Sequence, residues 1–278
     1  MDLKYYNHSG RYTFSGVLIA FLFGLALSLI LSFLNAYNLA KVTMMYLRVV
    51  LLALYGVLVG LAIEGGIQIG KIRSHKVLIA IAILINILLV YFRWVFYLTI
   101  TFNYKFLVIR PDDIIYLIKS FAVSGTWTYK STTPTGAMQY IIWIGEFLLT
   151  TGLSLGTAFM LFDSRIFCEV CNKWTDGNIA IENLEVSQDR DLIKKDLDNG
   201  NYNSLLSLTR NELEKNHYYK VSLKFCSSCN TINVLNISEI NVTKNSKGKE
   251  VKDEKFLVTN LLVPENKVDQ VKKFIEGN

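Results

Sequence analysis

Residues 14–33 read FSGVLIAFLFGLALSLILSF, an apolar run of helical length without a charged residue. A helix of about 20 such residues crosses the hydrocarbon core of a bilayer, which is about 30 Å thick. Lys4 and Arg11 precede the run, which is longer than a signal-peptide core and shows no A-x-A cleavage pattern. We therefore expect a retained span. Three further runs of spanning length cover residues 43–69, 77–101 and 139–162.

The sequence predicts a membrane α-helical fold in which residues 1–162 form a four-helix transmembrane bundle. Hydrophobic residues make up 51% of the chain and charged residues 19%, which excludes a single soluble globule, a disordered chain and a secreted disulfide scaffold. Residues 163–278 predict a small soluble mixed α/β domain. This tail carries 17 Lys and Arg against 18 Asp and Glu, so nucleic acid is not an expected partner.

Cations next to the predicted spans indicate the side of the membrane on which each loop lies. Lys71, Arg73 and Lys76 crowd the loop between the second and third spans, whereas the preceding loop contains Lys41. Because positive charge is enriched on the cytoplasmic side, this pattern predicts that both termini are cytoplasmic. Four cations in the longer loop, residues 102–138, which would then be extracytoplasmic, argue against it: Lys105, Arg110, Lys119 and Lys130.

The predicted extracytoplasmic loop at residues 102–138 is too long to be a plain connector. Pro111, Asp112 and Asp113 form a helix-start signal, and an apolar stripe from Ile114 to Phe121 follows it. We expect a short amphipathic helix there that covers the bundle.

The four cysteines of the chain fall in two C-x-x-C pairs, Cys168 with Cys171 and Cys226 with Cys229. A tight turn of this spacing brings two thiolates to one ion, and two such turns complete a tetrahedral zinc site. Strand-like alternation on both sides of the second pair is typical of a zinc ribbon. We predict a structural Zn²⁺ in a zinc-ribbon-like domain on the reducing, cytoplasmic side; two disulfides or a redox dithiol are the alternatives.

The spacing between the two pairs is longer than a compact ribbon uses, since 54 residues separate Cys171 from Cys226. Leucine and isoleucine at helical spacing predict a helical insert at about residues 180–215, broken at Asn199 and Gly200. Beyond the second pair three elements are expected: a polar loop or mobile hairpin tip at residues 241–253, a strand at 255–259 and a terminal amphipathic helix at 266–275.

Four charged residues lie inside the predicted spans, and three of them, Arg48, Arg93 and Glu146, lie toward the outer ends, whereas Glu64 lies near the inner end. A rise of 1.5 Å per residue puts the first three about 8, 12 and 10 Å from the outer ends of their spans, so they share one depth. Glu146 can pair with either arginine or with both. The cluster either holds the helices together, with the arginines reaching toward headgroups, or forms an outward-open polar pocket for a lipid headgroup, an anion or a proton.

Small residues recur every four positions along three of the predicted spans. Such stripes let helix backbones approach closely in a membrane. We expect them to serve packing within one chain, with a homo-oligomer as the alternative. The stripes are Gly16, Ala20, Gly24, Ser28 and Ser32; Gly56 with Gly60 and Gly66 with Gly70; and Gly152 with Gly156.

Three short motifs carry a family resemblance: residues 5–10 (YYNHSG), Gly125-Thr126-Trp127, and residues 167–171 (FCEVC) with Trp174 just beyond. In these residues the chain resembles a group of uncharacterised bacterial multi-pass membrane proteins with a C-terminal C-x-x-C zinc-binding tail. The resemblance implies a location in the bacterial inner membrane and brings no activity with it.

Three classes of function fit these features. The first is a membrane-anchored scaffold or regulator whose zinc-ribbon-like domain docks a cytosolic protein, since the tail lacks a recognisable catalytic signature. The second is a small-solute, ion or lipid-handling protein built around Glu146 and the two arginines. The third is an enzyme with intramembrane chemistry, which is disfavoured because the spans lack paired acids and a serine–lysine arrangement. We favour the first.

Overall fold

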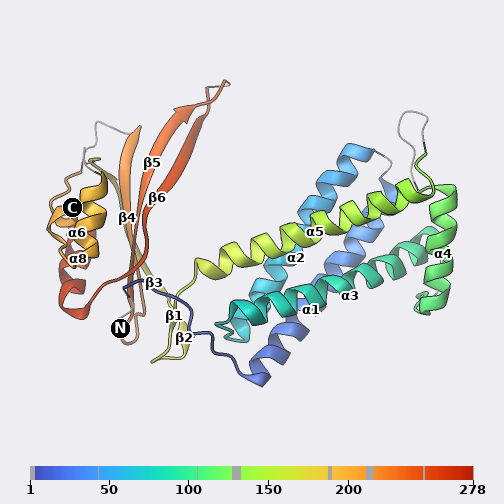
Figure 1. The fold of residues 1–278 in the computed structure, drawn as a ribbon, viewed down its shortest axis with the longest axis horizontal. Helices are drawn as coiled ribbons and strands as arrows, with labels where there is room; N and C mark the ends of the chain where they lie inside the picture. Colours follow the sequence, from blue (N-terminus) through green and yellow to red (C-terminus); the bar gives the residue numbers. More distant parts are fainter. Residues whose placement is uncertain are drawn as a thin grey trace. The chain divides into compact units, whose positions relative to one another are not determined.

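Four long helices and one short helix make up the first part of the chain in the computed structural model (Figure 1). The structure describes residues 4–42, 44–104, 106–126, 133–186, 190–210, 216–246 and 248–277. Residue 43 of the second predicted span, Lys105, Trp127 and Lys130, and residues 187–189 and 211–215 of the predicted insert lie outside these ranges. The chain divides into two units, Ser9–Ser164 and the combination of Met1–His8 with Arg165–Asn278.

The long helices of the first unit are α1 (Phe14–Lys41), α2 (Met45–Ile69), α3 (His75–Thr101) and α5 (Ala137–Asp163). They contain 25 to 28 residues, which corresponds to about 38 to 42 Å. All four are long and apolar enough to cross a membrane, so the prediction of four such helices is confirmed. The side chain of Thr13 caps α1 by accepting a hydrogen bond from the Gly16 amide at 3.1 Å.

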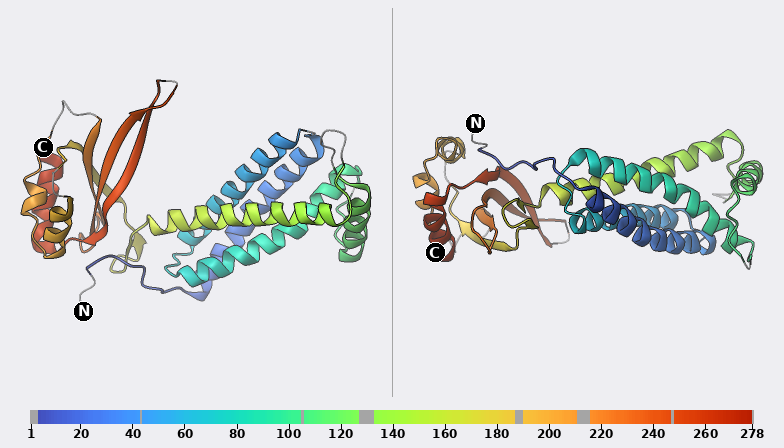
Figure 2. Two further views of the ribbon diagram at one scale, coloured as in Figure 1. Left: turned by 45° about the horizontal axis from the view of Figure 1, so that its top comes forward. Right: turned by 90° about the horizontal axis from the view of Figure 1, so that it is seen from below.

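The short helix α4 (Pro111–Ser124) is the amphipathic helix expected in the loop after α3, and it lies across one end of the bundle (Figure 2). Pro111 occupies the first turn, where its missing amide hydrogen costs no hydrogen bond, and Asp112 and Asp113 suit the positive end of the helix dipole. Ile114 is buried with Val95 and Leu98 of α3. This contact fixes α4 to the end of the bundle.

The small-residue stripes of α1 and α2 meet inside the bundle. A Cβ atom on Gly66 would lie 2.4 Å from the carbonyl oxygen of Ala20, and one on Gly60 would lie 2.5 Å from that of Ser154 in α5. α2 therefore packs backbone to backbone against α1 on one side and α5 on the other. The stripe of α5 differs, because among the described residues no heavy atom lies within 4 Å of a Cβ built on Gly152 or Gly156.

The second unit contains a two-stranded hairpin and a four-stranded antiparallel sheet. The hairpin pairs β1 (Phe167–Cys168) with β2 (Lys173–Trp174). The sheet has the order β3-β4-β5-β6, and its strands are β3 (Gly177–Leu184), β4 (His217–Phe225), β5 (Asn233–Lys244) and β6 (Glu250–Leu262).

Three helices cover one face of this sheet: α6 (Arg190–Asp198), α7 (Asn203–Leu206) and α8 (Glu265–Gly277) (Figure 1). Their apolar side chains, among them Ile193, Leu205 and Phe274, share one core with Tyr219 and Leu235 of the sheet. The predicted insert is therefore only partly helical. Its first residues belong to strand β3, and helices α6 and α7 are separated at Asn199 and Gly200, where Gly200 has a φ of 75°.

The polar stretch at residues 241–253 is the end of the β5–β6 hairpin, so the hairpin alternative is correct and the irregular backbone is confined to the turn between Lys244 and Glu250. β5 and β6 stay paired through Val242 with Lys252 and Lys244 with Glu250. β4 pairs with β5 only as far as Asn241, so the hairpin continues beyond the rest of the sheet. Most of its residues there are exposed on both faces. Such strands lack the alternation of buried and exposed residues by which a strand is recognised.

The start of the chain adds a short extended segment to the free edge of β6. The Tyr6 amide donates to the Asn260 carbonyl at 2.7 Å, and the Leu262 amide donates to the Lys4 carbonyl at 3.0 Å. The Tyr5 hydroxyl donates to the Asp198 carboxylate at 2.6 Å. Residues 4–8 thus belong to the sheet unit, although the sequence placed all of residues 1–162 in the helical domain.

The close contact at Gly60 predicts a difference between two glycine-to-alanine substitutions. Gly60→Ala puts a methyl group against the α5 backbone and should lower the free energy of unfolding by about 1–3 kcal/mol. Gly156→Ala is the matched control, because alanine there meets open space and improves helix propensity by up to about 1 kcal/mol. Thermal unfolding of the purified full-length variants measures both, and equal melting temperatures would contradict the described packing.

Candidate metal centre

The first cysteine pair lies in the turn of the β1–β2 hairpin. Cys168 ends β1, and the Cys171 amide donates to the Cys168 sulfur at 3.5 Å, which curls the turn around that atom. Asn172 follows with a φ of 50°. This left-handed conformation is one that asparagine tolerates better than most residues, and it lets the chain reverse directly into β2.

The second pair repeats the same turn between β4 and β5. The Asn230 amide donates to the Cys226 carbonyl at 2.9 Å, and the Cys226 amide donates to the Ile232 carbonyl at 3.3 Å. Asn230 has a φ of 53°. Both turns therefore have the pattern C-x-x-C-Asn with the asparagine in the left-handed region, and each presents two sulfurs on one side.

The two turns bring all four cysteines together, as predicted. Their sulfur atoms lie within 4.8 Å of one another, and the Cys168 and Cys229 sulfurs are 3.4 Å apart. The four thiols are free, and this separation exceeds the about 2.05 Å of a disulfide bond. Sulfurs around a tetrahedral zinc ion lie about 3.8 Å apart. The cluster can thus hold a metal ion, with Cys168 and Cys226 buried and the other two half-buried.

The thiols of the cluster differ in pKa. The Thr231 Oγ1 atom lies 2.9 Å from the Cys229 sulfur, and its hydrogen bond lowers the pKa of the Cys229 thiol to about 6. Hydrogen bonding to Cys229 and the other cysteines raises the pKa of Cys171 to about 12. A cation must displace the protons that the thiols hold, so metal binding should weaken as the pH falls.

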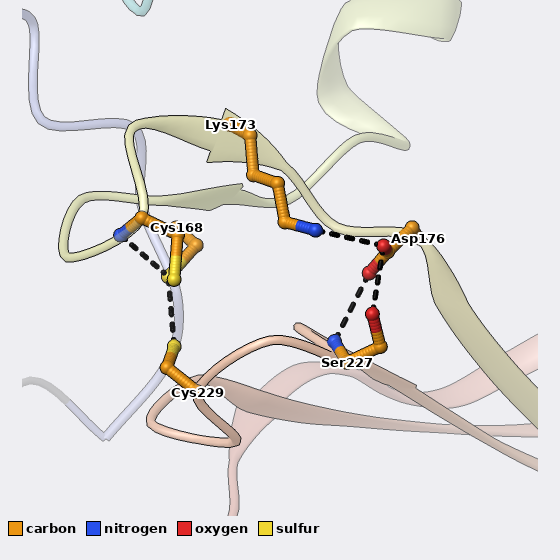
Figure 3. Close-up of polar contacts among 6 residues, drawn as sticks. Cys168, Lys173, Asp176, Ser227 and Cys229 are labelled. Atoms are coloured by element: carbon orange, nitrogen blue, oxygen red, sulfur yellow. Dashed lines mark hydrogen bonds and ion pairs between the residues drawn. The ribbon is translucent and has the colours of Figure 1, made fainter.

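Asp176 ties the two turns together (Figure 3). Its Oδ1 atom accepts from the Ser227 amide at 3.0 Å and its Oδ2 atom from the Ser227 hydroxyl at 2.8 Å. The Lys173 ammonium group forms an ion pair with it at 2.8 Å. Lys173 and then Ser227 hold the pKa of the Asp176 carboxyl well below its usual range, so the clamp stays charged at physiological pH.

The start of the chain packs against the first turn. The Phe167 amide donates to the Tyr6 hydroxyl at 2.9 Å. The ring of Trp174 stands edge-on to Phe167 with a centroid distance of 5.0 Å, and the rings of His8 and Trp174 are 6.1 Å apart. Two of the three motifs that carry the family resemblance therefore form one contact beside Cys168.

The intramembrane cluster predicted from the sequence lies within the helical unit. Arg93 and Glu146 form an ion pair, with 3.6 Å between Nη2 and Oε2. Arg48 instead donates to the carbonyl oxygen of Leu39 at 2.7 Å. All three side chains line one pocket. The structure thus brings the three residues together and pairs Glu146 with Arg93.

Sequence reasoning missed the residues that support the cysteines. The asparagine after each C-x-x-C pair was a readable signal, because the same residue type follows both pairs and tolerates the backbone that such a turn requires. Asp176 and Ser227 gave no such signal. Their contact depends on the register of β3 against β4, and local spacing does not specify that register.

The Asp176 clamp predicts a weaker metal site when it is removed. Asp176→Ala should lower metal affinity about 10- to 100-fold, as is usual when a group that orients ligands is lost. Competition with a chromogenic chelator measures this affinity on the full-length protein. Asp253→Ala serves as the control, since Asp253 is exposed on β6 and pairs with Asn241, far along the sheet from the cysteines. Equal affinities in the two variants would contradict a supporting role for the clamp.

The chain was also compared with known proteins. No family model, no curated protein and no solved structure matches it.

Proposed function

We propose that the protein is an integral membrane protein that anchors a zinc-ribbon-like interaction domain at the cytoplasmic face of a bacterial inner membrane. In this role it acts as a scaffold or regulator for a cytosolic protein partner. The four apolar helices support the anchoring part of the proposal, because each is long enough to cross the hydrocarbon core.

The observation that carries the proposal is the cluster of four cysteine sulfurs within 4.8 Å of one another. Four thiolates suit Zn²⁺ and fill its tetrahedral coordination shell, so no position is left for a substrate or a reactive water. A saturated site of this kind stabilises a fold and does not perform chemistry. Reduced thiols also fit a cytoplasmic location better than an oxidising one.

The two ends of the helical unit support a common side for both termini. An even number of spans returns the chain to the side from which it started. Residues 4–8, which precede α1, pair with β6, which follows α5. Such pairing requires both segments on one side of the membrane, and the cations Lys71, Arg73 and Lys76 favour the cytoplasm.

The proposed orientation predicts the behaviour of two reporter fusions. Green fluorescent protein at the C-terminus should fluoresce, and alkaline phosphatase at the same position should be inactive, because the phosphatase needs the oxidising side to form its disulfides. As the matched control, alkaline phosphatase fused after Ser124, at the end of α4, should be active. An active C-terminal phosphatase with an inactive Ser124 fusion would reverse the orientation and remove the proposed cytosolic partner.

The proposed role also predicts metal-dependent capture of a partner. Full-length protein in an uncharged detergent should contain one zinc ion per chain by elemental analysis. Cys171→Ser should lose most of that zinc, whereas Ser228→Ala, in the second turn, should keep it. Affinity purification from cytosolic extract should then recover a partner with the Ser228→Ala protein and lose it with Cys171→Ser or a chelator. The same partners in all samples would rule out metal-dependent docking.

A further inference from the structure

The helical unit contains a pocket into which three charged side chains project. Its lining residues come mainly from the end of α1, the start of α2 and facing parts of α3 and α5. Aromatic side chains form much of its wall, and the rings of Trp94 and Trp143 meet edge to face at 4.9 Å. The pocket is lined by Arg48, Arg93, Glu146, Trp94, Tyr97 and Trp143, among others.

The charged groups of this pocket do not balance. Two guanidinium groups face one carboxylate, and Arg93 takes that carboxylate as its partner at 3.6 Å. Arg48 donates one hydrogen bond to the Leu39 carbonyl. Its Nε atom is buried and has no hydrogen-bond partner in the part of the chain that the structure describes. One positive charge and one buried donor are therefore left for a ligand.

An unbalanced cation in an apolar surrounding attracts an anion strongly, because little water screens the interaction. Guanidinium groups present several N–H donors in one plane and match the oxygens of phosphate particularly well. Trp and Tyr side chains gather at the depth of lipid headgroups in membrane proteins. Helices of 27 residues, such as α3, exceed the hydrocarbon core by about 10 Å, so a site about 12 Å from a helix end can reach the headgroup phosphates.

We propose that this pocket binds a phosphate group, supplied either by a phospholipid headgroup or by free phosphate. Arg48 provides the unpaired charge and the free Nε donor. Arg93 provides a second guanidinium group, whose charge is offset by its ion pair with Glu146. The proposal does not depend on the metal-dependent role, because the cysteines and this pocket belong to different units.

Three substitutions in the full-length protein separate binding from folding. Arg48→Gln removes the unpaired charge and should weaken phosphate binding at least about tenfold, the usual loss for a charged hydrogen bond. Glu146→Gln removes the only negative charge among the described residues that line the pocket and should strengthen binding several-fold. Arg110→Gln is the matched control: the Arg110 side chain is 80% exposed and lies at the N-terminus of α4, outside the pocket lining, so binding should not change.

Two experiments distinguish the sources of the phosphate group. Titration calorimetry with inorganic phosphate, on protein in an uncharged detergent, tests the free anion. Native mass spectrometry of protein transferred to nanodiscs tests the lipid, with phosphatidylglycerol and phosphatidylcholine present in equal amounts. Phosphate binding in the first experiment indicates free phosphate, and retained phospholipid in the second indicates a headgroup.

Either positive result supports the proposal if Arg48→Gln reduces it and Arg110→Gln does not. Opposite effects of Arg48→Gln and Glu146→Gln would show that charge is responsible. If neither phosphate nor phospholipid is retained, or if Arg48→Gln binds as well as Arg110→Gln, the proposal is wrong. Equal losses in Arg48→Gln and Glu146→Gln would also overturn it, because they would indicate that the cluster only holds the helices together.

Discussion

The sheet unit depends on one constraint: two turns separated by 54 residues must deliver four sulfur atoms to one point. The register of the sheet meets this constraint. Gly177 pairs with Phe225, so Asp176 lies beside the second turn, where it binds Ser227. The pairing needs glycine at 177, because a Cβ there would lie 2.4 Å from the Phe225 ring. The register of β3 against β4 therefore determines how the two cysteine turns are brought together, and the contacts between the turns in turn favour that register.

The sequence predicted the parts of this fold that local patterns determine. Long apolar runs identify α1, α2, α3 and α5, and proline followed by two acids identifies α4. The C-x-x-C spacing identifies the cysteines. The strand residues at 241–253 gave no pattern, because solvent contacts both faces of that hairpin. The pairing of residues 4–8 could not be predicted either, because so short an edge segment is defined by its contact with β6 and not by its own composition.

In the helical unit, the sequence predicts the depth of a residue along its helix but not which residues of other helices it contacts. Helical rise converts residue number into depth, so Arg48, Arg93 and Glu146 could be assigned to one layer before their contacts were known. Which of them pair depends on the order of the helices around the bundle. α2 lies between α1 and α5 through its glycines, an order that the spacing of small residues does not encode because all the stripes share one period.

The segment at residues 4–8 covers part of the exposed edge of the sheet. β6 is an edge strand, and an edge strand with unpaired backbone groups invites pairing with other chains. Lys4, Tyr5 and Tyr6 cover its last residues, and Asp198 holds this segment through Tyr5 and Lys4. These two donors lower the pKa of Asp198, so their support is present at neutral pH and is lost as acid protonates the carboxylate. Because the same segment also contacts Phe167 beside Cys168, the start of the chain links the sheet edge to the metal centre.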